Sequence, residues 1–345
     1  MNINCKEIPY DFELERVSNE LKGAKRVIVQ LPEGLKKYTE CIQKSLSEVL
    51  ADTEIYFSME GSFGACDLRI FEAKLLGAQA IVHFGHTEYS LQETVTEIED
   101  LKVIFVPAYY KGHLPPGSVL NLGSNLKEIA SEKPLLVASV QYLKLVPTVK
   151  EELEKMGFKP IIGKSKKMLP GQIIGCDYSP LLSTKEADSV IVISGGIFHA
   201  LGAALTFSGP VLRLDPYTGY VEDLRKERDY WLKRRYAEMM RAKNATSWGI
   251  IVGSLLGQYR PSIVEIIRKE ISKAGMRYYL LLVSTLNKER ILNFDSDAID
   301  AYVVTSCPRI PIDDFGIDTF PKPILTPGEA LSVIKGKTEV YRFPW

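Results

Sequence analysis

Short apolar runs alternate with amphipathic stretches along the whole chain, and this alternation constrains the fold more than any other feature. The run RVIVQL at residues 26–31 is followed by Pro-Glu-Gly and then by apolar residues at helical spacing as far as Leu50. Runs of β-branched residues separated by amphipathic helices are typical of buried parallel strands joined by crossover helices. The pattern therefore predicts an α/β fold.

The same pattern occurs three times, with four predicted strands in each segment of about 100 residues. This repetition indicates three similar Rossmann-like βαβ domains, related by a pseudo-threefold arrangement around one central site. We place the domains at residues 1–115, 116–220 and 221–345. The strands are predicted at residues 26–31, 54–58, 80–84, 102–106, 134–140, 159–162, 189–194, 211–214, 249–252, 277–283, 301–305 and 323–325.

Two stretches connect the repeats. Residues 107–133 are rich in Pro, Gly and Asn, which predicts a loop. Residues 221–243 contain eight Lys or Arg and five Asp or Glu, a composition that predicts a long helix. Mixed charge runs usually face water, so a solvated spacer helix is one interpretation, and a docking surface for an acidic macromolecule is the other.

Charge and hydropathy exclude several classes of protein. Lys plus Arg and Asp plus Glu both number 43, which argues against a general nucleic-acid coat or a polybasic membrane binder and leaves a local basic face open. The longest apolar runs, such as residues 278–283, are far shorter than the roughly 20 residues of a membrane span. The first 20 residues offer no apolar stretch suited to a signal peptide, and five cysteines do not make a dense disulfide framework. We expect a cytoplasmic protein.

Cys66 and Cys176 occupy equivalent places in the first two repeats. Each follows the second predicted strand, in the sequences Ala-Cys-Asp and Gly-Cys-Asp, and Cys66 stands where a helix is expected to begin. Cys307 follows the third strand of its repeat. Ligands bind at the carboxyl edge of open α/β sheets, and a helix N-terminus there lowers the pKa of a thiol. We expect three thiolates to meet where the domains meet.

Three thiolates are compatible with two kinds of metal site. Catalytic zinc keeps one of its four positions open, and a [4Fe–4S] cluster with three cysteines leaves one iron free for another ligand. No CxxC or CxxxCxxC motif is present, and cysteine spacing alone does not choose between the two metals. Cys41, inside a helical pattern, is expected to be a buried small apolar side chain, and Cys5 is expected to have no role.

Several strands run into loops that suit a small-molecule ligand. The strand at residues 189–194 leads into Gly195 and Gly196 and then a helix, whose first N–H groups are free to bind a carboxylate. The spacing is not GxGxxG, which argues against a dinucleotide site. The other candidates are Gln30, Gly85, His86, His199, Gly253 and Gln258.

Each of these candidates has a simpler interpretation. The glutamines suit hydrogen bonds to adenine, ribose or amino-acid groups, but they also suit a loop or a cap. His86 and His199 are candidate ligands or bases, and equally candidates for hydrogen-bonded structural imidazoles. Asp313 and Asp314 either assist the site or cap a turn.

Five segments resemble the archaeal diphthamide synthase family, the 2-(3-amino-3-carboxypropyl)histidine synthases. They are EGSFGACD, GQIIGCDYSP, SGGIFHALG, WGIIVGSLLGQYRP and SCPRIPIDD, and the resemblance spans residues 8–328. It implies three similar domains around a [4Fe–4S] cluster that is bound by Cys66, Cys176 and Cys307. It also implies S-adenosylmethionine as co-substrate, with Gly195 and Gly196 in its pocket.

The resemblance further implies a radical transferase. A reduced cluster would break the bond from the sulfur of S-adenosylmethionine to its γ-carbon. The resulting 3-amino-3-carboxypropyl radical would add to C2 of a histidine imidazole in translation elongation factor 2. The family implies a homodimer, and the chemistry needs an electron donor. The alternatives are an enzyme like quinolinate synthase, which is also built from three domains around a three-cysteine cluster, and a non-enzymatic α/β scaffold with inert cysteines.

Overall fold

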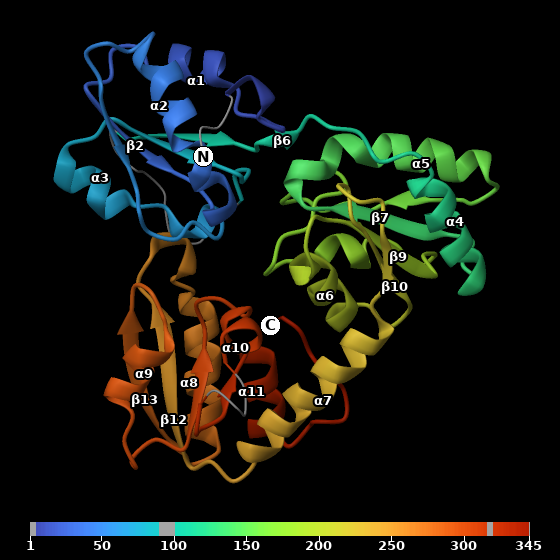
Figure 1. Ribbon diagram of the computed structural model, residues 1–345. Helices are drawn as coiled ribbons and strands as arrows, with labels where there is room; N and C mark the ends of the chain where they lie inside the picture. The colour runs from blue at the N-terminus through green and yellow to red at the C-terminus, as the bar shows by residue number, and fades with distance from the viewer. Residues whose placement is uncertain (1–4, 90–100, 316–319, 345) are drawn as a thin grey trace.

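The computed structural model describes residues 5–89, 101–315 and 320–344, and it contains three mainly parallel sheets and one small antiparallel sheet (Figure 1). The first sheet consists of β2 (Arg26–Gln30), β3 (Glu54–Phe57), β4 (Ala80–Phe84) and β5 (Lys102–Val106), in the order β3-β2-β4-β5. Its four strands coincide with the four predicted for the first repeat. Their order places the first strand beside both the second and the third.

The other two sheets repeat this order. In the second domain β8 (Ile161–Ile162), β7 (Pro134–Ala138), β9 (Ser189–Ile193) and β10 (Val211–Leu214) lie side by side in this order. In the third domain the order is β13 (Arg277–Val283), β12 (Ser247–Gly253), β14 (Ala301–Val304) and β15 (Ile324–Leu325). The prediction of three similar α/β domains is therefore confirmed.

Helices cover both faces of each sheet. In β2, Val27 and Val29 pack toward α1 and α2, whereas Ile28 between them packs toward α3. Strands covered on both faces are apolar at successive positions, which explains the continuous apolar runs in the sequence. The helices are α1 (Leu14–Glu20), α2 (Thr39–Ser47), α3 (Ile70–Leu76), α4 (Ser118–Glu128), α5 (Val146–Lys155), α6 (Ile197–Thr206), α7 (Arg225–Arg241), α8 (Pro261–Lys273), α9 (Lys288–Phe294), α10 (Ile310–Asp313) and α11 (Pro327–Ile334).

The first connection is more structured than its composition predicts. After β5 the chain forms β6 (Tyr109–Tyr110), which pairs antiparallel with β1 (Tyr10–Asp11) near the N-terminus. Helix α4 follows within the stretch predicted as a loop. Its Leu122 and Leu126 are fully buried against the second sheet, so tertiary packing outweighs the low helix propensity of its Gly and Asn residues.

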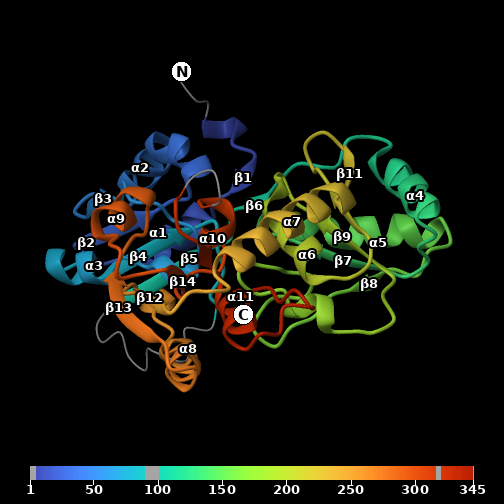
Figure 2. The same cartoon turned by 90° about the horizontal axis from the view of Figure 1, so that it is seen from below.

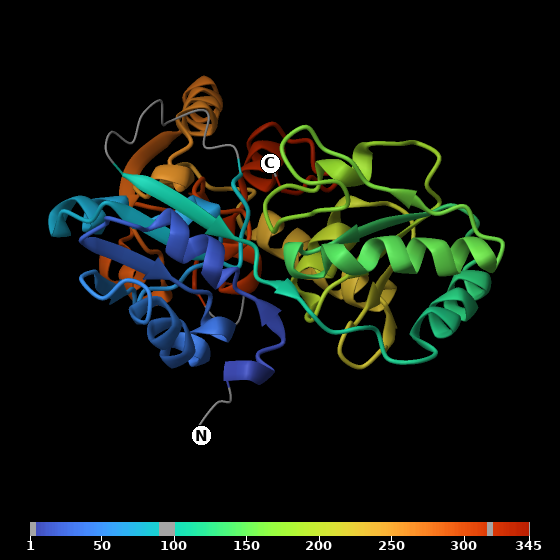
Figure 3. The same cartoon turned by 90° about the horizontal axis from the view of Figure 1, so that it is seen from above.

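The second connection also differs from the prediction. It begins as β11 (Val221–Asp223), which pairs antiparallel with β10 and so extends the second sheet past the domain limit predicted at residue 220. Helix α7 then leads to the third domain, and Figures 2 and 3 show the second domain to one side of the other two. The helix is not simply a solvated spacer, because Arg235, Glu238 and Met239 are buried. No helix of the described residues is long and apolar enough to cross a membrane.

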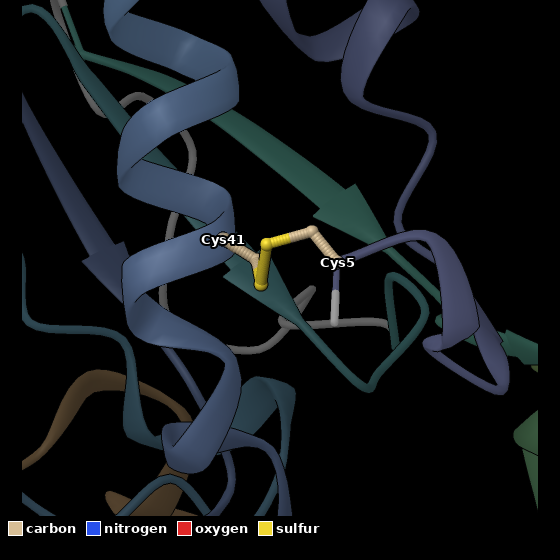
Figure 4. Close-up of a disulfide and its surroundings, with 2 residues drawn as sticks. All are labelled: Cys5 and Cys41. Atoms are coloured by element: carbon tan, nitrogen blue, oxygen red, sulfur yellow. A yellow bond between two sulfur atoms is a disulfide. The ribbon is translucent and has the colours of Figure 1, made fainter. Parts of the chain in front are cut away.

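Cys5 and Cys41 form a disulfide (Figure 4), with an S–S distance of 2.08 Å. The expectations of a free buried thiol at Cys41 and of no role for Cys5 were therefore wrong. The bond joins a short 3-10 turn, η1 (Cys5–Glu7), to helix α2, across 36 positions of sequence. Separation in sequence hid the pairing, since only the fold brings the N-terminal turn to this helix.

A buried ion pair fastens α7 to the third domain. The Arg235 guanidinium donates to both carboxylate oxygens of Glu329 at 2.8 and 2.6 Å, and neither side chain is more than 2% exposed. It also donates to the carbonyls of Pro311 and Ile324 at 2.8 and 2.9 Å. Glu329 in turn completes a capping box with Thr326 at the start of α11. The pair thus links α7, α10, β15 and α11.

We expect Arg235→Met or Glu329→Gln to destabilise the protein by about 3–5 kcal/mol, because each leaves a buried charge without its partner. The double variant Arg235→Met/Glu329→Leu should recover much of this loss, since it removes both charges. Urea denaturation monitored by circular dichroism measures the effect. The control is Arg225→Met on the same helix, whose exposed ion pair with Asp223 should contribute little to stability. A loss under about 1 kcal/mol in both single variants would contradict the assignment.

Candidate functional site

The candidate site residues lie at the carboxyl edges of the three sheets. Gln30 ends β2 and Gly85 follows β4, which are the first and third strands of the first sheet. Gly195 follows β9 in the second sheet, and in the third sheet Gly253 ends β12. In a parallel sheet of this order, the loops after the first and third strands separate and leave a crevice. The candidate residues thus lie at the sheet edges where such a crevice is expected.

Loops at these edges bind the domains to one another. The side chain of Gln141 donates to the carbonyl of Gly85 at 2.6 Å, and the hydroxyl of Tyr89 donates to Asp177 at 2.7 Å. Both contacts join the first domain to the second. The turn η3 (Ala65–Asp67) packs on η6 (Leu256–Gln258) of the third domain. The loops that carry the candidate residues are therefore also domain contacts.

Cys66, Cys176 and Cys307 are half-buried thiols outside the described disulfide, and they are near enough to act on one another electrostatically. Burial raises the pKa of Cys66 well above its usual range and that of Cys176 to about 12, and it raises the pKa of Cys307 as well. Repulsion between the thiolates adds to the shift at Cys66 and Cys176. Among the described residues, no three His, Cys, Asp or Glu side chains are gathered for a single metal ion.

The expected lowering of the thiol pKa values by helix N-termini does not occur. Cys66 lies in η3 and helix α3 begins only at Ile70, while Cys176 lies in a turn between Ile174 and Asp177. Only Cys307 accepts hydrogen bonds from backbone N–H groups before a helix, those of Arg309 and Ile310. Burial outweighs them, so without a metal all three thiols are protonated at neutral pH.

Two arginines that the sequence analysis did not single out favour the thiolate forms of these cysteines. Arg260 acts to lower the pKa of all three cysteines, and Arg309 acts on Cys307. Arg309 is held by a bidentate ion pair with Asp313, at 2.9 and 2.8 Å, so this aspartate positions an arginine. Both arginines belong to segments that carry the family resemblance, GQYRP and CPRIP. Their place in these segments could have identified them as candidate site residues.

The histidines near the site are neutral. His86 lies 2.9 Å from His83, ring nitrogen to ring nitrogen, and burial lowers the pKa of His86 to about 4 and that of His83 well below its usual range. Burial lowers the pKa of His199 to about 3, and the electrostatic effects of Arg309 and His86 act in the same direction. His86 also hydrogen-bonds the backbone of Phe84 and Phe63, which favours the structural interpretation of this residue.

The two glycines before α6 differ in their surroundings: Gly195 is crowded, whereas Gly196 borders open space. A Cβ on Gly195 would lie 2.6 Å from the hydroxyl of Tyr142 and 2.8 Å from the ring of Tyr217, so a side chain is excluded there. Nothing lies within 4 Å of the corresponding position at Gly196, which caps α6. In the third domain a Cβ on Gly253 would lie 2.6 Å from Ser306, next to Cys307. Gln258 is half-buried beside it in η6.

Gln30 holds the loop of Cys66. Its side-chain amide donates to the carbonyl of Asp67 at 3.2 Å and accepts from the backbone N–H of Arg69 at 3.1 Å. The residue is almost fully buried at 1% exposure. The structure therefore gives Gln30 a positioning role. The sequence analysis had considered only a ligand contact or a loop or cap residue.

Residues 31–343 match the family model described as "Putative diphthamide synthesis protein". The chain belongs to this family. It is 33% identical to 2-(3-amino-3-carboxypropyl)histidine synthase of Pyrococcus horikoshii, over 97% of this chain and 93% of that one. It is 30% identical to subunit 1 of the same synthase from Aspergillus fumigatus, over 93% of this chain and 70% of the relative. The predicted enzyme family is confirmed.

A solved structure shares the fold. The crystal structure of Dph2 from Pyrococcus horikoshii with a 4Fe-4S cluster superposes with a TM-score of 0.83 and 31% sequence identity, covering 96% of this chain and 93% of that one. The same protein, solved in a second crystal structure, matches equally well over 97% of this chain. Family members of this fold are thus known with the cluster that the five segments imply.

We expect Gln30→Leu to expose Cys66 selectively, because the backbone at Asp67 and Arg69 loses both hydrogen bonds to this side chain. Local opening should become on the order of tenfold more frequent. Alkylation of the metal-free protein followed by peptide mass spectrometry measures this as faster labelling of Cys66 relative to Cys307. Gln43→Leu on the exposed face of α2 is the matched control. Equal labelling rates in both variants would contradict the positioning role.

Proposed function

We propose that the chain transfers the 3-amino-3-carboxypropyl group of S-adenosylmethionine to C2 of a histidine imidazole in translation elongation factor 2. The observation that carries this proposal is that three cysteines outside the described disulfide, one from each domain, lie near enough to act on one another electrostatically. The family match supports it over an enzyme like quinolinate synthase and over an inert scaffold.

The residues present fit a [4Fe–4S] cluster. Cys66, Cys176 and Cys307 would supply three thiolates and leave one iron open to S-adenosylmethionine. Arg260 and Arg309 would offset the negative charge of an all-thiolate cluster, since both already act to lower the pKa of a cysteine at this site. When bound and reduced, the cluster supplies the low-potential electron that breaks the bond between the sulfonium and its γ-carbon, so that transfer proceeds by a radical.

The chain's own residues would hold the co-substrate and keep water out. Gly196 and the open first turn of α6 would lie against S-adenosylmethionine, with Gly85, Gly253 and Gln258 in the loops around it. His86 and His199 are neutral at physiological pH, so they would add no positive charge beside a sulfonium. A physiological electron donor is required, and the enzyme would act in the cytoplasm, where the elongation factor is found.

A homodimer is part of this proposal. Strand β13 forms an outer edge of the third sheet, and its Leu280 and Leu282 are 54% and 74% exposed. An exposed apolar edge strand suits pairing with the same strand of a second copy, because the two edges would satisfy each other's backbone groups. Light scattering at micromolar concentration should give twice the chain mass of 38.7 kDa, and a monomer mass would contradict the dimer.

We expect Cys66→Ser, Cys176→Ser and Cys307→Ser each to lose most of the bound iron after anaerobic reconstitution, because each removes one of three protein ligands. The matched control is the double variant Cys5→Ser/Cys41→Ser, which removes the disulfide between η1 and α2 and should keep full iron content. Iron analysis and visible absorbance per chain provide the measurement. Full iron in all three single variants would end the ligand assignment.

The decisive test is anaerobic incubation of the chain with dithionite, S-adenosylmethionine and the elongation factor, followed by mass spectrometry. We expect an aminocarboxypropyl group on one histidine of the factor and 5′-methylthioadenosine as the small product. Without the factor, 5′-methylthioadenosine should still form, and its formation should need the reductant. 5′-Deoxyadenosine as the main product would reject the proposed bond cleavage, and turnover without any electron source would reject the radical.

A further inference from the structure

Arg309 is buried with part of its guanidinium unused. Its Nε and Nη2 groups pair with Asp313, and the residue is 4% exposed. Nη1 is buried too and, among the described residues, has no hydrogen-bond partner. Buried N–H groups are nearly always satisfied in folded proteins, so an unused donor in a candidate site indicates a ligand that completes it. A guanidinium donor that is already fixed in position suits an anion.

The position of this guanidinium is set by its packing. It lies over the ring of Phe198, with 4.0 Å between the guanidinium carbon and the ring centroid. A Cβ on Gly175, the residue before Cys176, would lie 2.6 Å from the Phe198 ring and 3.5 Å from Arg309 Cγ. Only glycine therefore allows this three-residue stack, which brings the second and third domains together beside two of the three cysteines.

The stack places Arg309 at the N-terminus of α6. Phe198 is the second residue of this ten-residue helix, and Gly196, its N-cap residue, has no side chain to satisfy the first N–H groups. Residues 195–198 are exposed, and the space next to Gly196 is open. Free N–H groups and the helix dipole at this end favour a negative charge. Two independent features, the unused Nη1 and the open helix end, thus point to one anion.

We propose that Arg309 Nη1 and the N-terminus of α6 together bind the α-carboxylate of the aminocarboxypropyl part of S-adenosylmethionine. The proposal rests on the proposed function and names the residue that orients the group to be transferred. Arg309 follows Cys307 by two positions, so a carboxylate held here lies next to the thiolate ligand of the third domain. Arg309 is in this sense a specificity residue, since it selects a co-substrate that carries a carboxylate.

The test compares S-adenosylmethionine with decarboxylated S-adenosylmethionine, which keeps the sulfonium and adenosine but lacks the carboxylate. Equilibrium dialysis uses the anaerobically reconstituted, unreduced protein, so binding is measured without turnover. We expect the wild-type chain to bind S-adenosylmethionine about 10- to 100-fold more tightly than the decarboxylated analogue. In Arg309→Met the affinity for S-adenosylmethionine should fall by that factor, while the affinity for the analogue stays within about twofold.

Paired variants guard against loss of the fold. Arg309→Met leaves Asp313 without its partner, so the double variant Arg309→Met/Asp313→Asn is measured alongside it and should show the same selective loss. Arg241→Met removes a comparable arginine from an ion pair with Glu238 in α7 and should change neither affinity. Iron content and circular dichroism establish that each variant is folded and loaded. If neither Arg309 variant folds, wild-type discrimination between the two compounds still decides, and equal affinities overturn the proposal.

The outcomes separate this inference from the proposed function. Equal weakening of both compounds in Arg309→Met, or weakening of neither, overturns the carboxylate site while leaving the proposed function intact. A shift of the cluster's reduction potential in Arg309→Met without co-substrate, with unchanged discrimination, would assign Nη1 to the cluster and also overturn it. If the wild-type chain binds no S-adenosylmethionine, both the proposed function and this inference fail.

Discussion

The carboxyl edge of a parallel sheet is the constraint on which the rest of this structure depends. The parallel strands of each domain end at the same edge of their sheet, and the strand order repeated in all three sheets opens a crevice between the loops after the first and third strands. Each of the three sheets carries candidate site residues at its carboxyl edge. Because the loops at these edges also contact one another, the site exists only where the domains are docked.

Docking concentrates groups that are costly to bury. Burial raises the pKa of all three thiols, repulsion between them adds to this at Cys66 and Cys176, and two arginines oppose the shift. A buried donor without a partner costs free energy, so the unsatisfied Arg309 Nη1 favours a ligand that completes it. The buried Arg235–Glu329 pair also reaches this region, because Arg235 donates to the carbonyl of Pro311 within α10, four residues after Cys307.

The partners of the polar residues at the candidate site could not be predicted from the sequence. Gln30 ends a buried strand at the carboxyl edge of the first sheet. This position suits a contact with a cofactor and a structural hydrogen bond to a neighbouring loop equally well. Its amide turned out to hold the backbone on both sides of Leu68. His86 is similar, because its partner His83 lies within an apolar strand and the pairing of two rings depends on the turn at Gly85. Local sequence does not encode which neighbour a side chain meets.

The sequence by itself determined the α/β class, the twelve strands and the one loop cysteine in each repeat, because apolar periodicity and turn residues are local properties. It did not determine the pairing of Cys5 with Cys41, the burial of one face of α7, or the raised pKa values of the three thiols. Each of these depends on contacts between residues far apart in the chain. The tertiary structure alone decided them, because burial and electrostatic coupling arise only when distant segments pack together.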